Sequence, residues 1–391
     1  MRTFTAAERR ARLVRRHHLA PDTRAADVVD VARDLVALHG TDPAAVFLAL
    51  RARLCAPALE SIEAALYEQR SLIRILAMRR TVFVVTAEIG PVVHAACTRE
   101  VAARSRKTYQ DFLARAGVGD GRWLAEVEAS TLRALTARGS AYGGELAADE
   151  PRLRQRVMLA RGKSYQTELN LTSWVLLLLA ADGLIARGRP RGSWVSSQFR
   201  WHPIQDWLPG GLGALPTEFA QMELARLWLR TFGPGTAADL RWWTGWTMRA
   251  TQAALRGAGA VAVDLEGAAG FGLPDDLEPE AAAEPGPALL PALDPTIMGW
   301  AGREWYLGER GRELFDRSGN PCPSVWWDGR VVGAWAQRQD GEVAFRLWED
   351  IGREGAAQVA AEAARLRAWL GDVRLAPRTR IPPPIERELT A

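Results

Sequence analysis

The sequence predicts an α+β fold in which one order of elements, three or more helices followed by a β-hairpin, occurs three times before a β-rich C-terminal region. Apolar residues recur at three- and four-residue spacing in the segments expected to be helical. Short β-rich segments follow each set of helices. Beyond residue 288, strand-like runs are separated by Asp328-Gly329 and Asp340-Gly341, dipeptides typical of hairpin turns.

The first set lies in residues 1–110. Helices are expected over Ala6–His18, Ala25–Leu38, 42–54 and Leu59–Gln69. The third of these begins with Asp42, which can cap backbone N–H groups, and Pro43, which suits a first helical turn. A hairpin follows, with strands Ile73–Ala77 and Thr81–Val85.

The second and third sets repeat this order over 111–210 and 211–275. The expected helices are 122–138, Gly144–Ala148 and Thr167–Ala181, then Phe219–Phe232, Ala237–Trp243 and Thr247–Gly257. The expected hairpins are Leu184–Trp201 and a ribbon formed by 261–267 with 271–274. Because helices followed by a two-stranded ribbon form a winged helix-turn-helix, the sequence predicts three tandem winged-helix modules at 1–110, 111–210 and 211–275.

The remaining sequence changes in character. Residues 276–287 are acidic and rich in proline and alanine, and are expected to be a linker. Residues 288–391 are expected to form a small β-rich domain that contains a terminal helix, Ala356–Trp369.

Composition excludes several classes of protein. The 391 residues are 48% hydrophobic and 25% charged, which excludes a disordered chain. The longest apolar run, Trp174–Ala181, is too short for a membrane span, and the first ten residues lack the core of a secretory signal, so we expect a cytoplasmic protein. Three distant cysteines and five histidines favour neither disulfides nor a metal site, and no cofactor motif is found.

The hairpin expected at Leu184–Trp201 has the sequence pattern of a DNA contact. From Arg187 to Arg200 it has four arginines and no acidic residue. Arginine pairs with phosphates and enters DNA grooves, so we expect this hairpin to contact duplex DNA, although a solvated hairpin remains the alternative. The expected DNA-binding residues here are Arg187, Arg189, Arg191, Trp194, Gln198 and Arg200. The first hairpin is a weaker version with Arg74, Arg79 and Arg80.

The segment Leu38–Pro43 brings an imidazole, a hydroxyl and a carboxylate within four positions. His39, Thr41 and Asp42 could orient and deprotonate a water molecule. Each also has a structural explanation: His39 could cap the preceding helix, Asp42 the next one, and Thr41 could be an ordinary loop hydroxyl. Spacing alone favours the structural interpretation.

Several segments, in order along nearly the whole chain, carry a resemblance to a known family. These are Leu35–Pro43, Leu72–Thr81, Arg191–Arg200, Leu289–Pro295 and Trp327–Trp335. The chain resembles the bacterial winged-helix proteins related to the azinomycin-resistance DNA glycosylases. The resemblance implies a monofunctional glycosylase that acts on bulky alkylated purines and crosslinks in duplex DNA, without a metal or an organic cofactor.

The sequence departs from this family at the residues expected to be catalytic. Relatives carry Gln-x-Gln or Gln-x-Asp where this chain has His39 and Thr41. If catalysis persists, the resemblance assigns His39 to activating or orienting water, Thr41 to assisting it by hydrogen bonding, and Asp42 to an alternative orienting role. The family also has glycine and histidine at the positions of Arg80 and Phe83.

Two functions therefore remain open. The first is an alkylpurine DNA glycosylase, and the second is a non-catalytic DNA-binding protein, such as a transcription regulator or a damage binder. A small-molecule enzyme has little support, because phosphate-cradling glycine loops and nucleophile elbows are missing from the sequence. Three modules in tandem favour a monomer that wraps one site, since dimeric readers normally carry one helix-turn-helix per subunit.

Overall fold

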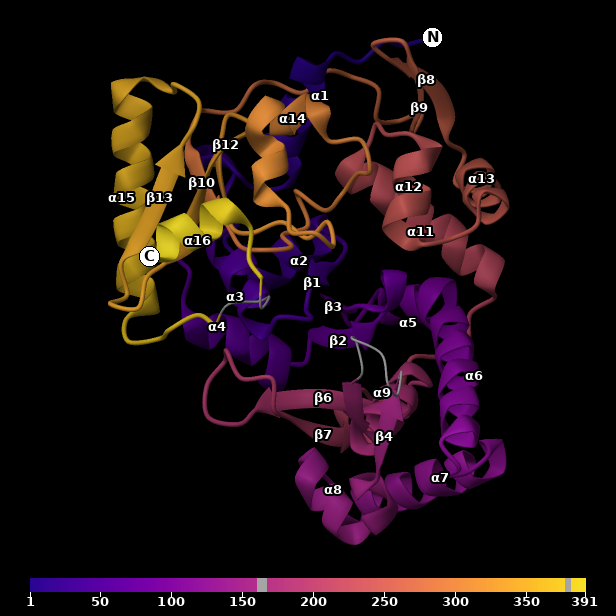
Figure 1. Cartoon of the computed structure of the whole chain (residues 1–391). Helices are drawn as coiled ribbons and strands as arrows, with labels where there is room; N and C mark the ends of the chain where they lie inside the picture. The colour runs from indigo at the N-terminus through magenta and orange to yellow at the C-terminus, as the bar shows by residue number, and fades with distance from the viewer. Residues whose placement is uncertain (160–166, 377–380) are drawn as a thin grey trace. The chain divides into compact units, whose positions relative to one another are not determined.

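The computed structural model describes residues 1–159, 167–376 and 381–391 and has a mixed fold of helices and strands (Figure 1). It divides into two compact units. One, here called the continuous unit, is Ala64–Gln221; the other, here called the split unit, combines Met1–Glu63 with Met222–Ala391. Each unit contains both helices and strands.

In the continuous unit, helices enclose an apolar core and strands pair as antiparallel hairpins. The helices are α5 (Gly90–Val93), α6 (Arg99–Arg115), α7 (Gly121–Arg138), α8 (Gly143–Asp149), α9 (Leu171–Ala181) and α10 (Ile204–Trp207). The paired strands are β2 (Leu72–Leu76) with β3 (Val82–Thr86), β4 (Arg156–Leu159) with β5 (Thr167–Asn170), and β6 (Ile185–Pro190) with β7 (Phe199–Pro203). The hairpins expected near residues 73–85 and 184–201 are confirmed.

The core of this unit forms around α9, which is apolar on nearly all sides. Trp174 lies parallel to the ring of Tyr109 from α6, with 4.5 Å between ring centroids. Leucines and valines of α7 and α9 complete the cluster. A helix that is apolar all round must be covered on all sides, so α9 fixes the helices that surround it.

The expectation of a helix over Thr167–Ala181 is wrong for its first four residues. Thr167–Asn170 is strand β5, paired with β4 in register from Leu159 to Arg156. Asn170 ends the strand and starts the helix, because its side chain accepts a hydrogen bond from the backbone N–H of Thr172 at 2.9 Å. The apolar sequence therefore begins its helical stretch at Leu171.

The split unit contains two groups of helices and one larger sheet. Its helices are α1 (Ala6–Arg16), α2 (Val28–Asp34), α3 (Pro43–Arg51), α4 (Leu59–Glu63), α12 (Ala237–Thr244), α13 (Met248–Gly257), α14 (Glu304–Leu307), α15 (Gly352–Leu370) and α16 (Pro384–Thr390), together with most of α11 (Thr217–Phe232). Its strands are β1 (Leu38–His39), β8 (Val261–Leu265), β9 (Ala268–Gly272), β10 (Pro287–Leu290), β11 (Ser324–Trp327), β12 (Arg330–Gln337) and β13 (Val343–Leu347). The strands β10-β11-β12-β13 form an antiparallel sheet in that order, while β8 and β9 form a separate hairpin.

Aromatic side chains fill the core of the split unit. Trp300 stacks on His17 and meets Phe232 edge-on, at centroid distances of 6.0 and 5.4 Å. Trp335 of β12 is 1% exposed and donates its ring N–H to the carbonyl of Leu290. The hydrogen bond of Trp335 shows how the polar edge of a buried tryptophan ring is satisfied in this core.

The acidic segment that follows β9 is bound to α1. Asp276 forms ion pairs with Arg12 at 3.0 Å and Arg16 at 2.7 Å. Arg16 also contacts Glu280 at 2.6 Å. The segment expected to be a linker is therefore held along a helix by opposite charge, and it forms no helix or strand before Pro287, where β10 begins.

Two other expected helices are shorter than the sequence pattern suggested. The helix expected over Ala25–Leu38 spans only Val28–Asp34, because Asp27 caps its start and the backbone turns at Val36 with a φ of 62°. The helix expected over Leu59–Gln69 is α-helical only to Glu63 and continues as one π-helical turn. The compact units are defined by contact and the modules by topology, so the module boundaries at 1–110, 111–210 and 211–275 stay predictions.

Candidate active-site loop and nucleic-acid interface

The three candidate catalytic residues lie in one short segment of the split unit but differ in exposure. His39 is the second residue of β1 and is only 6% exposed. Thr41 is exposed, and Asp42 is partly exposed. The side chains that reach the surface here are therefore the hydroxyl and the carboxylate, whereas the imidazole is buried.

Asp42 has the structural role that the sequence suggested. Its carboxylate accepts a hydrogen bond from the backbone N–H of Ala44 at 3.0 Å, and Pro43 follows as the first residue of α3. The cap satisfies a backbone donor that the helix leaves unpaired. It also fixes the direction of the carboxylate, which is a requirement for any chemistry that this group performs.

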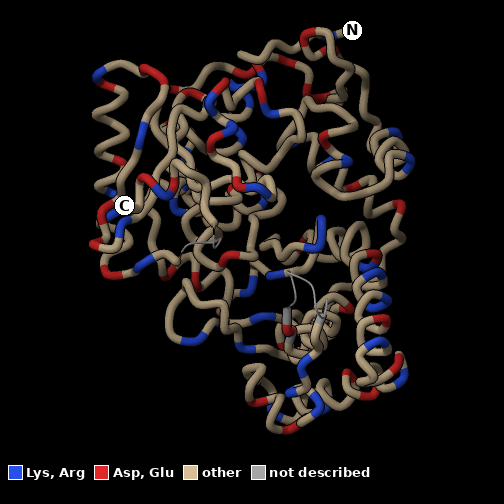
Figure 2. Tube along the Cα trace, in the orientation of Figure 1, with Lys and Arg blue, Asp and Glu red and all other residues tan. Residues whose placement is uncertain are grey.

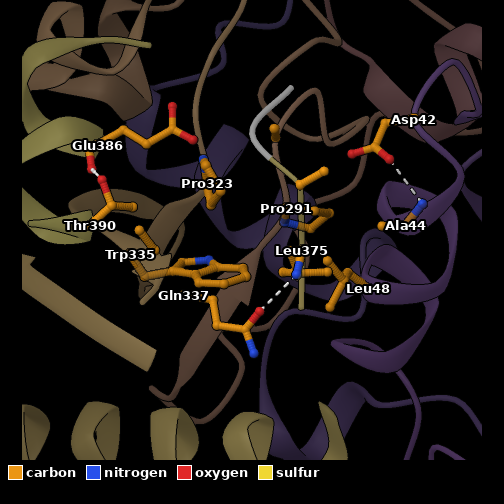
Figure 3. A pocket seen from close by; sticks show the side chains of 13 residues that line it. Asp42, Ala44, Leu48, Pro291, Pro323, Trp335, Gln337, Leu375, Glu386 and Thr390 are labelled. Carbon is orange, nitrogen blue, oxygen red and sulfur yellow. Dashed lines mark hydrogen bonds between the residues drawn. The ribbon is translucent and has the colours of Figure 1, made fainter. Parts of the chain in front are cut away.

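Asp42 lines a small pocket inside the split unit (Figure 3). The cavity has a volume of about 80 Å³, below the roughly 300 Å³ at which small-molecule sites begin. Its walls combine apolar side chains, among them Leu48 and Trp335, with polar groups from α16. Figure 3 shows Asp42 and Glu386 on opposite sides of this pocket, with Pro323 and Pro291 between them.

Sequence reasoning missed the contribution of α16 to this pocket. Ile385 and Leu389 are buried at a spacing of four residues, which places Glu386 and Thr390 along the pocket wall. The signal was present in the sequence as a proline-rich start at Pro384 followed by that apolar spacing.

The predicted DNA-binding arginines of the second hairpin lie in the continuous unit and differ in their surroundings. Arg189 and Arg191 are exposed, whereas Arg187 and Arg200 are partly exposed. Arg187 lies directly across from Trp201 in the β6–β7 register, and the strands shift register beyond it. In Figure 2 several basic positions lie along this hairpin.

Aromatic rings hold these guanidinium groups in place. The Cζ atoms of Arg191 and Arg200 each lie 4.5 Å from the ring centroid of Tyr142, the residue that precedes α8. Arg189 lies 5.0 Å from the ring of Tyr67, and it forms an exposed ion pair with Glu68 at 3.2 Å. Stacking on rings orders an arginine without neutralising its charge.

The tip of this hairpin presents fewer groups than the sequence suggested. Gln198 is exposed, and its carbonyl accepts the N–H of Arg191 at 2.9 Å. Trp194 is only 6% exposed, so contact between its ring and DNA requires the tip to rearrange. That contact stays a prediction.

The first hairpin carries its arginines in two different environments. Arg74 lies on β2 and is only 9% exposed, with its Cζ 4.9 Å from the ring centroid of Phe199. Arg79 and Arg80 form the turn between β2 and β3, where both have positive φ angles of 53° and 62°. Arg80 is exposed. Of these three, Arg80 has the exposure that a surface contact with DNA needs.

Desolvation affects two groups near the second hairpin. Burial lowers the pKa of Arg187 to about 10, and the positive charge of Arg74 adds to this effect. Burial also lowers the pKa of His202, with further contributions from Arg70 and Arg200. The hairpin thus concentrates positive charge, and this disfavours the charged form of His202.

The described residues contain neither a metal-binding cluster nor a membrane-spanning helix. Among residues 1–159, 167–376 and 381–391, no three histidine, cysteine or acidic side chains gather as a metal site would require. No helix in the same ranges combines the length and the apolar character that a membrane span needs.

Comparisons with known proteins show that this chain is similar to DNA glycosylases. The family described as DNA glycosylase AlkZ-like matches residues 32–369. The solved structure of the Streptomyces sahachiroi DNA glycosylase AlkZ has a TM-score of 0.71 and 21% sequence identity, over 94% of this chain and 98% of that one. At this identity the structural likeness concerns the fold. A search of curated protein sequences found no match.

Proposed function

Because the chain belongs to the DNA glycosylase AlkZ-like family, and so is a DNA-repair hydrolase of N-glycosyl bonds, we propose that its substrates are bulky alkylated purines in duplex DNA, crosslinks included. The family match over residues 32–369 is the observation that carries this proposal. We further propose that the protein works in the cytoplasm as a monomer.

We propose that three winged-helix modules in tandem bind the DNA. The element order supports it: α7, α8 and α9 precede the β6–β7 hairpin, and α11, α12 and α13 precede the β8–β9 hairpin. Helix caps reinforce the third set, where Thr236 and Asp239 form a capping box at α12. Each module would present a helix and a hairpin to the duplex.

The chemistry needs little from the protein. An alkyl group on a ring nitrogen makes the purine cationic, so the bond from C1′ to the purine breaks with its electron pair moving to that ring. The sugar becomes oxocarbenium-like, water forms the new bond to C1′, and the proton of that water passes to a base. The protein must hold DNA, stabilise the positive sugar and orient water.

We propose that Asp42 is the base that accepts the proton of the attacking water. Thr41 lies next to it in the chain, and His39 is a positioning residue. Asp42 combines partial exposure with a place on the pocket wall, and a carboxylate there favours the positive charge of the sugar. His39 is 6% exposed, so its ring acts from behind the loop. This shifts the main role from His39, which the resemblance favoured, to the residue that the resemblance made an alternative.

The proposed DNA contacts are the arginines of both hairpins and the residues of the second tip. They are Arg74, Arg79, Arg80, Arg187, Arg189, Arg191, Trp194, Gln198 and Arg200. The stacking of Arg191 and Arg200 on Tyr142 supports this assignment, because ordered guanidinium groups lose less entropy when they bind phosphate.

The test is release of modified bases from duplexes that carry N7-methylguanine, bulky N-alkylpurines or an interstrand crosslink, scored as abasic sites. We expect Asp42→Asn to lower the rate about 100-fold or more while keeping its helix cap, since asparagine caps as well as aspartate. The matched control is Asp27→Asn, which makes the same change at the cap of α2. His39→Gln, which restores the family residue, is expected to retain activity.

The second candidate function is a non-catalytic DNA binder. It is favoured by the absence of the family's glutamine at His39 and of glutamine or aspartate at Thr41. Wild-type protein that binds duplex DNA but releases no base from any of these lesions would establish it.

A further inference from the structure

Two arginines of the continuous unit are desolvated without an acidic partner. Arg74 is 9% exposed, and neither its Nε nor its Nη1 has a hydrogen-bond partner in the described part of the chain. Its Nη2 reaches only the hydroxyl of Tyr67, at 3.5 Å. Arg187 forms no ion pair or hydrogen bond with any described residue, and the charge that acts on it is that of Arg74.

The surroundings of this pair are aromatic. Phe199 lies under Arg74 and Trp201 under Arg187, each with 4.9 Å from Cζ to ring centroid. Phe199 and Trp201 are two residues apart on β7, so they point to the same face of the hairpin. Tyr67 is 7% exposed and adds its hydroxyl. The result is a cluster of two guanidinium groups backed by rings, here called the arginine recess.

Such an arrangement costs folding free energy unless an anion enters. Burying a charge without a partner is unfavourable, and two like charges side by side increase the cost. Rings reduce that cost only in part, because cation–π contacts leave the N–H donors unsatisfied. A negatively charged ligand would offset this cost, because it would pair with both guanidinium groups.

The donor geometry selects the class of anion. A guanidinium presents N–H groups in a planar fork that suits the paired oxygens of a carboxylate or phosphate. One phosphodiester has two non-bridging oxygens, so it offers an acceptor to each of the two guanidinium groups. We propose that the arginine recess is a phosphate site that receives one phosphodiester of the DNA backbone. This inference rests on the proposed function for its ligand, whereas the recess itself rests on the contacts above.

The role differs from that of the exposed hairpin arginines. Arg189, for comparison, is exposed and already pairs with Glu68. Exposed arginines contribute to binding through a screened field. A phosphate in the arginine recess would instead be fixed in position, so the recess sets where the backbone lies on this unit.

A first experiment measures the recess without DNA. Thermal unfolding is followed in inorganic phosphate and in sodium chloride at equal ionic strength, for wild type, Arg74→Met, Arg187→Gln and the control Arg122→Gln. Arg122 lies on α7, is 88% exposed and pairs with Glu126. We expect phosphate to raise the Tm of wild type and of the control, and each recess variant to lose at least half of that rise. Equal rises in all four proteins would overturn the site.

The same data separate a ligand site from a purely structural role. In chloride the recess variants are expected to unfold at or above the wild-type temperature, because each removes a desolvated charge that lacks an acidic partner. If both unfold several degrees lower, the arginines serve the fold through their rings and the proposal fails. Two variants keep this test valid if one of them does not fold.

A second experiment measures binding of a fluorescein-labelled, undamaged duplex by anisotropy from 50 to 300 mM salt. Each recess variant should bind about tenfold more weakly at 100 mM salt. Its plot of log Kd against log salt should also flatten by about one unit, as for one lost phosphate contact. The double variant should flatten by about one, not two, because both arginines serve the same phosphate. Unchanged slopes, or a loss of two, would overturn the proposal.

The two experiments distinguish this inference from the proposed function. If wild type binds DNA and the recess variants match it in slope, DNA binding stands and the recess proposal fails. If phosphate stabilises wild type through the recess but no duplex binds, an anion site stands and the proposed function fails.

Discussion

Two sites, one in each compact unit, hold desolvated arginines with opposite charge balance. In the split unit Arg53 is completely buried, and its guanidinium contacts both carboxylate oxygens of Asp294 at 2.9 and 2.6 Å. Further bonds run to Thr296 and to backbone carbonyls. In the continuous unit Arg74 and Arg187 are desolvated against rings, and no carboxylate of the described residues pairs with them.

This difference separates two uses of one residue type. Burial and ring contacts occur in both units, so neither identifies a binding residue. What differs is charge balance: Arg53 is neutralised inside the fold, whereas the arginine recess retains two positive charges. A neutralised arginine stabilises the fold, and one that lacks an acidic partner is suited to a ligand.

The largest effect is expected from removing the charge opposite Arg53. Asp294→Asn should lower the free energy of unfolding by about 3–5 kcal/mol, because it leaves a fully buried guanidinium without a counter-charge. Urea unfolding measures this. Arg74→Met, which removes a charge that has no partner, should cost far less or stabilise. Similar losses in both variants would show that the two arginines are not of different kinds.

An intermediate effect is expected at Glu362, which pairs with Arg51 and is 2% exposed. Burial alone would raise its pKa, but Arg51, Arg365 and Arg24 outweigh it and hold the pKa below the usual 4.5. A lowered folded-state pKa gives stability that is present above pH 4.5 and is lost as pH falls through the folded value. Glu362→Gln should cost about 2 kcal/mol at pH 7.

The measurement is urea unfolding from pH 3 to 7. Wild type should lose stability below about pH 4.5, and Glu362→Gln should lose less over the same range, so the two curves converge in acid. Glu126→Gln, in an exposed pair with Arg122, serves as control and should follow wild type. Parallel curves for wild type and Glu362→Gln would show that the ionised Glu362 carboxylate does not stabilise the fold.

The sequence predicted most elements and the basic hairpin, because both depend on local pattern. Apolar periodicity located α7 and α9, and the cap at Asp42 followed from its place before Pro43. The strand Thr167–Asn170 was missed because its partner, not its own pattern, decides its structure. Helices α6 and α16 were also missed, although both carry helical spacing.

Charge balance could not be predicted from the sequence. Asp294 lies 241 positions from Arg53, and Glu362 lies 311 positions from Arg51. Local spacing does not indicate which arginine a distant carboxylate neutralises. For the same reason the sequence grouped Arg74 with Arg79 and Arg80, whereas desolvation without an acidic partner groups it with Arg187. The family resemblance supplied the function that local pattern left open.

The smallest effect is expected at Arg80, an exposed arginine that belongs to neither buried class. Its φ of 62° lies in the left-handed region, which costs an L-residue about 1–2 kcal/mol. Glycine removes that strain but gains entropy in the unfolded chain, so Arg80→Gly should raise the free energy of unfolding by about 0.5–1 kcal/mol. Urea unfolding would measure the gain.

The same variant tests why an arginine occupies this turn. If Arg80 contacts a phosphate, Arg80→Gly should flatten the salt dependence of duplex binding by about one unit while the fold becomes more stable. Arg80→Gln, which keeps the strain and removes the charge, should lose the same binding without gaining stability. If both variants lose DNA affinity and only Arg80→Gly gains stability, the charge of Arg80 serves DNA binding and its backbone strain lowers the stability of the fold. Equal duplex binding by wild type and both variants would remove Arg80 from the interface and leave the strain without a functional reason.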